Sequence, residues 1–77
     1  MTSPDQQAVG RALRELRKQA GLTQEQVAER MGTSSTYLSR LEAGQRDIRL
    51  STTLRLLDAV GADLHQLADA IGRVESR

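Results

Sequence analysis

The pattern that most constrains this chain is the regular alternation of short apolar stripes with the glycines that end them. Gly21, Gly32, Gly44 and Gly61 each follow a run whose apolar residues recur every three or four positions. Glycine adopts the left-handed conformation beyond a helix end at little steric cost, and we assign every glycine of the chain this capping role. No segment alternates as a strand would. The sequence therefore predicts an all-α domain of five short helices.

Polar residues suited to capping helix N-termini precede these stripes. Thr23 and Asp63 are each followed three positions later by a glutamine, which predicts a capping box at the start of the second and fifth helices. The expected caps in chain order are Ser3 (followed by Pro4, Asp5 and Gln6), Thr23, Thr33 or Ser34, Asp47 or Ser51, and Asp63. Between the third and fourth helices, residues 45–49 are expected to form a loop anchored by Ile48.

The apolar positions of each stripe are expected to face one shared core. They are Val9, Leu13, Leu16 and Ala20, then Val27, Ala28 and Met31, then Leu38 and Leu41, then Leu50, Leu54, Leu57 and Val60, and last Leu64, Leu67, Ala68, Ile71 and Val74. We expect one domain over residues 1–77, with a core of about 5–72 and a frayed tail at 73–77.

Composition excludes several classes of function. The 77 residues contain no cysteine and one histidine, so a disulfide scaffold, a cysteine zinc site and a multi-histidine metal site are excluded. No apolar run of about 18 residues predicts a membrane span, no secretory signal is visible, and the cytoplasm is the expected location. The serines at 34, 35 and 39 have no base placed to activate them. We therefore expect neither an enzyme nor a cofactor.

The middle of the chain carries the most informative pattern. Two short helices meet across Gly32-Thr33-Ser34, a spacing typical of a helix-turn-helix, whose second helix enters the DNA major groove. The relevant segments are Gly21-Leu22-Thr23-Gln24-Glu25-Gln26-Val27-Ala28, then Tyr37-Leu38-Ser39-Arg40-Leu41-Glu42-Ala43-Gly44, then Arg46. They resemble the lambda-repressor-like, or XRE, helix-turn-helix family over about residues 9–71.

That resemblance implies a five-helix DNA-binding domain in which the third helix reads bases. The chain departs from the family pattern at two places. Ala43 stands where the family often has asparagine, which removes one polar contact near DNA, and Ile48-Arg49 stand where it often has Pro-Ser. The second departure leaves the cap of the fourth helix open.

A helical projection of the third helix supports base reading independently. With Leu38 and Leu41 inward, the outward side carries small residues and one long basic side chain. An arginine there can form two hydrogen bonds with guanine, and a threonine methyl can contact thymine. The candidate base-reading residues are Ser35, at the flank, and Thr36, Ser39 and Arg40. The alternative is an ordinary solvated surface, which the composition of this face alone favours; the family resemblance favours base reading instead.

Other polar residues are candidates for contacts with the DNA backbone. They are Gln24, Ser34, Arg46 and Arg49. In family members a glutamine at the place of Gln24 commonly contacts phosphate, although a plain polar first-turn residue and, for Ser34, a plain helix cap are the alternatives. The resemblance also pairs Arg17 with Glu42. We interpret the basic cluster of Arg11, Arg14 and Lys18 as a solvated face, with Arg14 alone a candidate neighbour of phosphate.

The small net positive charge and the apolar residues of the fourth and fifth helices both favour a dimer. Residues 1–49 carry eight basic and six acidic groups, a net +2, whereas residues 50–77 carry three basic and four acidic groups, a net −1. So small an excess binds DNA weakly unless a second copy doubles the contacts. The candidate dimer residues are Leu56, Leu64, Leu67, Ala68 and Ile71. Alternatively, these residues complete the monomer core.

The sequence thus favours a sequence-specific double-stranded DNA-binding transcriptional regulator, acting as a homodimer on a palindromic operator. Two alternatives remain open. One is an antitoxin-like module that holds a toxin or other protein partner. The other is a controller protein of a restriction–modification system, which Arg46-Asp47-Ile48 fits. Single-stranded nucleic acid is disfavoured because Tyr37 is the only aromatic residue.

Overall fold

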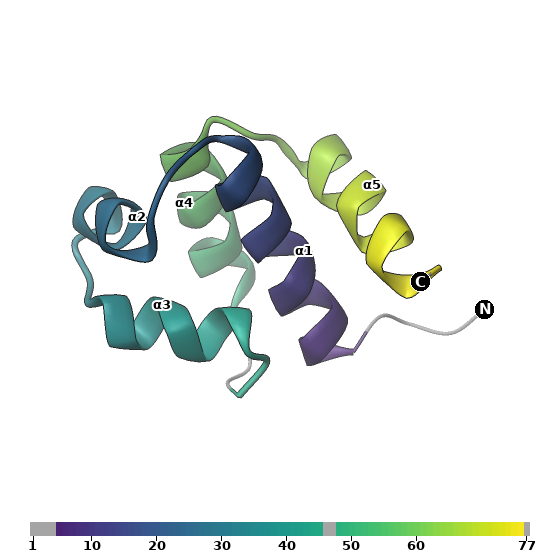
Figure 1. The fold of residues 1–77 in the computed structure, drawn as a ribbon, viewed down its shortest axis with the longest axis horizontal. Helices are drawn as coiled ribbons and strands as arrows, with labels where there is room; N and C mark the ends of the chain where they lie inside the picture. The colour runs from purple at the N-terminus through teal and green to yellow at the C-terminus, as the bar shows by residue number, and fades with distance from the viewer. Residues whose placement is uncertain (1–4, 46–47, 77) are drawn as a thin grey trace.

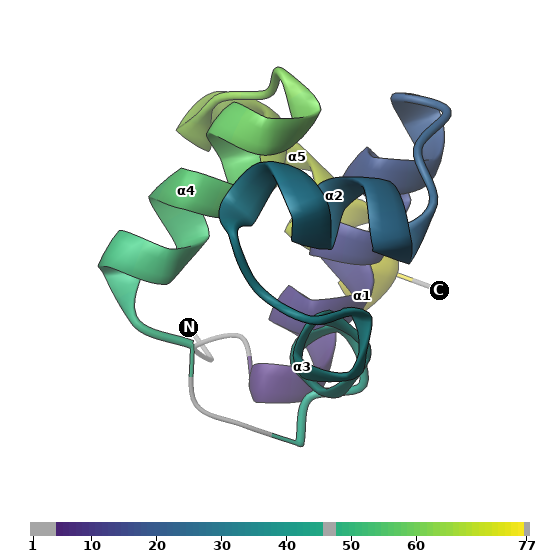
Figure 2. The same ribbon diagram turned by 90° about the vertical axis from the view of Figure 1, so that its left-hand side faces the viewer.

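The computed structural model describes residues 5–45 and 48–76, and these residues form five helices and no strand, as the sequence predicts (Figure 1). The helices are α1 (Gln6–Gln19), α2 (Gln24–Met31), α3 (Ser35–Glu42), α4 (Leu50–Val60) and α5 (Leu64–Glu75). In Figure 1, α1 separates α5 on one side from α2 and α3 on the other. In Figure 2, α3 is seen along its axis and α2 crosses above it.

The capping boxes expected from the sequence are present. The Thr23 hydroxyl accepts from the Gln26 amide at 3.1 Å, and the Gln26 side chain accepts from the Thr23 amide at 2.8 Å. Asp63 and Gln66 make the same reciprocal pair, both at 2.9 Å. Ser34 caps α3 by accepting from the Tyr37 amide. These bonds satisfy helix-end amides that have no partner within their own helix.

Two caps differ from prediction. Asp5, and not Ser3, caps α1, because its carboxylate accepts from the Ala8 amide at 2.7 Å. Ser3 and Pro4 lie outside the described residues. The N-cap of α4 is Arg49, whose side chain makes no capping bond, and Ser51 lies inside the helix. Asp47, the other candidate cap, also lies outside the described residues.

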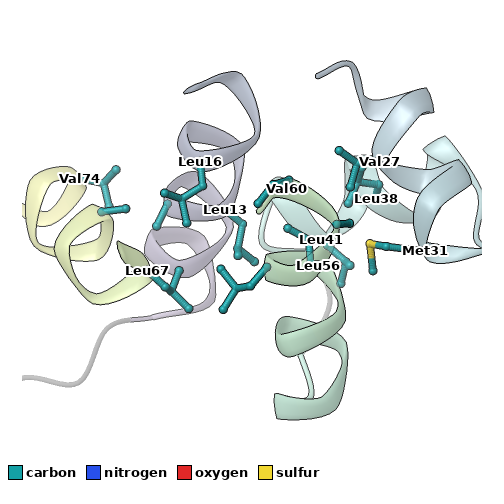
Figure 3. Close-up of a cluster of buried hydrophobic side chains, with 14 of the residues drawn as sticks. Leu13, Leu16, Val27, Met31, Leu38, Leu41, Leu56, Val60, Leu67 and Val74 are labelled. Carbon is teal, nitrogen blue, oxygen red and sulfur yellow. The ribbon is translucent and has the colours of Figure 1, made fainter. Parts of the chain in front are cut away.

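The core draws on all five helices (Figure 3). Its largest fully buried side chains are Leu13, Val27, Leu38, Leu41 and Leu56. Ile48 packs against this cluster, which confirms that it anchors the segment before α4. The inward positions expected in α2 and α3 are likewise buried.

In α4 the buried face differs from the predicted one. Leu50 and Leu54 are 67% and 45% exposed, whereas Leu56 is fully buried on the same side as Thr53 and Val60. Leucines at 54, 56 and 57 are compatible with two rotations of this helix, and packing against α1 and α2 selects the one that buries Leu56. Leu56 therefore belongs to the core, and its assignment to a dimer surface is wrong.

In α5 the buried residues are Leu67, Ala70 and Val74. The assignment of Leu67 to a dimer surface is wrong for the same reason as that of Leu56. Among the predicted inward positions, Ala20 and Ala68 are exposed and Leu64 is 52% exposed. The tail expected to fray is helical through Glu75, because Val74 is buried and Arg73 forms an ion pair with Glu15 on α1 at 2.8 Å.

Two glycines lie inside helices, contrary to the capping role predicted for all of them. A Cβ on Gly10 in α1 would lie 2.5 Å from the carbonyl oxygen of Glu42 and 2.6 Å from that of Leu41. Gly10 therefore allows α1 to contact the C-terminal end of α3 directly. At Gly72 in α5, no atom of the described residues outside the local helix backbone lies within 4 Å of the Cβ position. The other four glycines have positive φ, as the capping prediction requires.

Candidate nucleic-acid interface

The turn between α2 and α3 has the expected compact form. Gly32 adopts φ 71° and ψ 34° and ends α2, and the Thr33 amide donates to the Ala28 carbonyl at 2.9 Å. Ser34 then caps α3 at once. Because the turn is so short, α2 fixes where α3 begins, as in a helix-turn-helix.

The outward face of α3 carries the residues predicted to read bases. Thr36, Ser39 and Arg40 are exposed, and Ser35 is half-buried at the flank. Leu38 and Leu41 are fully buried and hold the opposite side of the helix. Small side chains around one arginine leave room for a groove to approach, so the placement suits base reading.

A buried ion pair fixes α3 against α1. Arg17 donates to Glu42 through Nε at 2.7 Å and through Nη2 at 3.0 Å. The same guanidinium donates through Nη1 to the carbonyl of Leu22, just before α2. The pairing that the family resemblance implied is therefore present. The Arg17 side chain links α1 to α3 and to the segment that precedes α2.

Gln24 belongs to the same network. Its side-chain Nε2 donates to Oε1 of Glu42 at 3.0 Å. An amide nitrogen carries two N–H groups, so one remains for an external acceptor while the other is held. The first-turn backbone amides of Gln24 and Glu25 have no acceptor among the residues that the structure describes. The N-terminus of α2 thus presents several donors that suit a phosphate.

The basic residues divide into two groups. Arg17, Arg73, Arg30 and Arg55 are used within the chain: the first two form the ion pairs described above, Arg30 donates to the Ala59 carbonyl at 2.8 Å, and Arg55 donates to that of Met31. The cations with no partner among the described residues are Arg11, Arg14, Lys18, Arg40 and Arg49. All of these lie at or before residue 49: three are on α1, one is on α3, and Arg49 is the N-cap of α4.

A depression of about 660 Å³ lies between α1, α2 and α3. Its lining residues are Arg14, Arg17, Lys18, Gly21, Leu22, Thr23, Gln24, Glu25, Ser39, Glu42 and Ala43. The depression therefore joins the free donors of α2 to the outward face of α3. Sequence reasoning did not assign Lys18 to this site; its i, i+4 spacing from Arg14 was the available signal.

The other three residues predicted to contact the DNA backbone differ in their placement. The Ser34 hydroxyl is exposed, and its oxygen is already used as a helix cap. Arg49 is exposed at the start of α4. Arg46 lies outside the described residues. Across the residues the structure describes, no three metal-ligating side chains gather, and no helix is long and apolar enough to cross a membrane.

Comparison with known proteins places the chain in a family. Residues 8–70 match the helix-turn-helix domain family, and the chain belongs to it. It is 45% identical over 53 residues to an uncharacterized HTH-type transcriptional regulator, y4dJ, of Sinorhizobium fredii, covering 69% of each chain. It is 41% identical over 58 residues, 75% of its length, to a propionyl-CoA carboxylase regulator of Cereibacter sphaeroides, but spans only 13% of that longer protein.

Two solved structures share the fold. The clp gene regulator ClgR of Corynebacterium glutamicum superposes with a TM-score of 0.84 at 29% identity, over 90% of both chains. The restriction–modification controller protein C.AhdI of Aeromonas hydrophila superposes at 0.77 with 36% identity, over 82% of this chain and 91% of that one. The chain is therefore a DNA-binding transcription regulator of the helix-turn-helix class and not an enzyme.

Proposed function

We propose that this chain is a sequence-specific transcriptional regulator that binds a palindromic operator as a homodimer in the cytoplasm. The observation that carries the proposal is the exposed Arg40 on the outward face of α3, which has no partner among the described residues. The buried Arg17–Glu42 pair holds this helix in place. Rigid support matters because base readout requires hydrogen bonds of fixed geometry.

In the complex, the outward face of α3 lies in the major groove. Arg40 donates two hydrogen bonds to a guanine edge, and the Thr36 methyl group contacts a thymine methyl. Ser35 and Ser39 are small enough to allow close approach and can bond to either base edges or phosphate. Their exposed or half-exposed positions beside Arg40 support these roles.

The backbone contacts flank the groove. Gln24 uses its second side-chain N–H and its backbone amide for one phosphate, and Ser34, Arg46 and Arg49 hold the strand near α3 and α4. Contacts of this kind orient the protein but carry no base preference. The polar, donor-rich surface at the start of α2 supports this part of the proposal.

The second copy is expected to cover exposed apolar residues on α5 and α4. Leu64 is 52% exposed, Ala68 is exposed and Ile71 is half-buried, so these predicted dimer residues remain accessible. Leu50 and Leu54, expected in the core, add a second exposed apolar pair on α4. A two-fold dimer would present two α3 helices about 34 Å apart to half-sites one helical turn apart.

Selection of bound sequences from random duplex DNA tests this function. The proposal expects an enriched site with two inverted half-sites, and a mass of two chains per duplex by light scattering. Enrichment of a single unrepeated half-site would exclude the palindromic dimer. Equal recovery of all sequences would exclude sequence-specific regulation.

A controller role in a restriction–modification system is the second candidate, favoured by 36% identity to C.AhdI over most of that protein. An antitoxin-like role, in which a toxin covers the exposed leucines, is a third. Genes beside the coding sequence and the proteins that co-purify with the native chain distinguish them. A neighbouring endonuclease gene preceded by the selected operator supports the controller role, whereas a stoichiometric protein partner that displaces DNA supports the antitoxin role.

A further inference from the structure

The helix α1 lies outside the helix-turn-helix, yet it carries two exposed cations beside it. Arg14 and Lys18 are separated by four residues, so they lie on one face of α1, about 6 Å apart along its axis. Neither makes a hydrogen bond or an ion pair with a residue that the structure describes. Their charge is therefore not neutralised within the described chain.

These two cations line the same depression as the base-reading helix. Ser39 of α3, Ala43 at its C-cap and Gln24 of α2 contribute to the other walls. The third cation of the depression, Arg17, is already committed to Glu42. Glu25 is the remaining carboxylate there, so the unpaired groups are two cations against one anion. The depression favours a negatively charged ligand that can also reach Ser39.

The DNA backbone has this chemistry and this position. When α3 enters the major groove, the strands that border the groove pass along the two sides of the helix. The depression lies on one of those sides and holds the free donors of the first turn of α2 as well. Arginine and lysine bind phosphates without reading sequence, and each neutralised phosphate strengthens the salt dependence of binding.

We propose that Arg14 and Lys18 of α1 form a phosphate-binding surface that extends the DNA contact beyond the helix-turn-helix. This inference rests on the proposed DNA-binding mode of α3. It changes the interpretation of Lys18 from a solvated face to part of the interface, and it joins Lys18 to Arg14, which the sequence already offered as a candidate neighbour of phosphate. It also raises the number of backbone contacts per chain, which a domain with a net charge of only +1 needs.

Arg11 provides a matched control on the same helix. It is also exposed, and it also has no described partner. It does not line the depression shared with α3. It lines a second depression, together with Arg14, Glu15, Lys18, Gln19 and Val74. Replacing Arg11 changes the net charge by the same amount as replacing Arg14, so the pair separates a local contact from a general charge effect.

The experiment measures the affinity of the full chain for the selected operator and for a scrambled duplex by fluorescence anisotropy, between 50 and 300 mM salt. For Arg14→Gln and for Lys18→Gln, the slope of log affinity against log salt is expected to fall by about 0.9 per bound chain, and for the double variant by about 1.8. Arg14→Lys keeps the charge and is expected to restore the slope. Affinity for both duplexes should fall by the same factor.

Several outcomes would overturn the inference. An unchanged slope in the double variant shows that the two cations do not contact phosphate, and an equal fall in Arg11→Gln shows only a general charge effect. A larger loss on the operator than on the scrambled duplex assigns the residues to base reading. A different result would separate this inference from the proposed function. If the wild-type protein prefers no sequence but the double variant still lowers the slope of log affinity against log salt, the phosphate-binding surface is supported and sequence-specific regulation is excluded. Thermal melting confirms that each variant is folded.

Discussion

The guanidinium of Arg17 and the carboxylate of Glu42 are joined by two hydrogen bonds, at 2.7 and 3.0 Å, although they lie on different helices. Both residues are more than nine-tenths buried. Burial of two charges is costly, so the pair is tolerated only because each group is bonded to the other and to neighbouring polar atoms. The orientation of α3, the helix proposed to read bases, therefore depends on this contact.

Replacement of Arg17 by methionine should destabilise the domain strongly. The change leaves Glu42 buried without its cation, and such a loss typically costs about 3–5 kcal/mol. Urea unfolding followed by circular dichroism measures it. The double variant Arg17→Met/Glu42→Leu should recover most of the stability, because it removes both charges. The half-exposed Arg73–Glu15 pair is the control, and Arg73→Gln should cost less than about 1 kcal/mol. A loss that small in Arg17→Met itself would contradict the structural role.

Replacement of Gly10 by alanine should displace α3. The new Cβ would lie within 3 Å of backbone atoms at the end of that helix, which no rotamer change can relieve. Overpacking of this kind costs about 1–3 kcal/mol. Gly72→Ala on α5 is the matched control, because nothing lies within 4 Å of its Cβ position, and helix propensity favours alanine there by about 1 kcal/mol. Thermal melting should show opposite shifts; a rise for both would mean that α1 and α3 are not in close contact.

Replacement of Arg49 by serine should raise stability while weakening DNA binding. Arg49 occupies the N-cap of α4 with extended backbone angles but makes no side-chain capping bond. Serine can supply that bond, which is worth about 1 kcal/mol. The proposed phosphate contact of Arg49 would be lost at the same time, lowering the salt slope by about 0.9 per chain. Melting and anisotropy measurements on the same sample test both effects. An unchanged salt slope would remove Arg49 from the interface.

Replacement of Leu64 by glutamate should shift the chain from dimer to monomer without unfolding it. Leu64 is largely exposed, so a charge there is tolerated in the monomer but not in an apolar contact. Sedimentation velocity measures the mass, and Leu50→Glu/Leu54→Glu tests the second exposed pair on α4 in the same way. Leu56→Ala, by contrast, should lower stability by about 2–5 kcal/mol because Leu56 is in the core. Retention of the dimer in all the glutamate variants would refute both proposed surfaces.

Local features of this fold could be predicted from the sequence, and features that depend on distant contacts could not. The Thr23 and Asp63 capping boxes join residues three apart, so their pattern is visible directly. The rotation of α4 was missed because Leu54 and Leu56 are equally apolar, and only the packing of other helices distinguishes them.

In the candidate site, too, local features could be predicted and features that depend on distant contacts could not. The outward placement of Ser39 and Arg40 follows from helical periodicity once Leu38 and Leu41 are inward. The contact of Gly10 with the end of α3 was invisible, because it joins segments about thirty residues apart. The depression that brings Lys18 beside Ser39 exists only after three helices have packed.

The most direct test of base reading by α3 compares Arg40→Ala with wild-type protein on the selected operator and on its single-base variants. We expect a loss of about 1–3 kcal/mol on the operator and no remaining preference at one base pair of each half-site. Gln24→Ala, the control, should weaken binding to every duplex by one common factor. If Arg40→Ala leaves the base preference intact, or weakens binding to all duplexes equally, α3 does not read bases through Arg40.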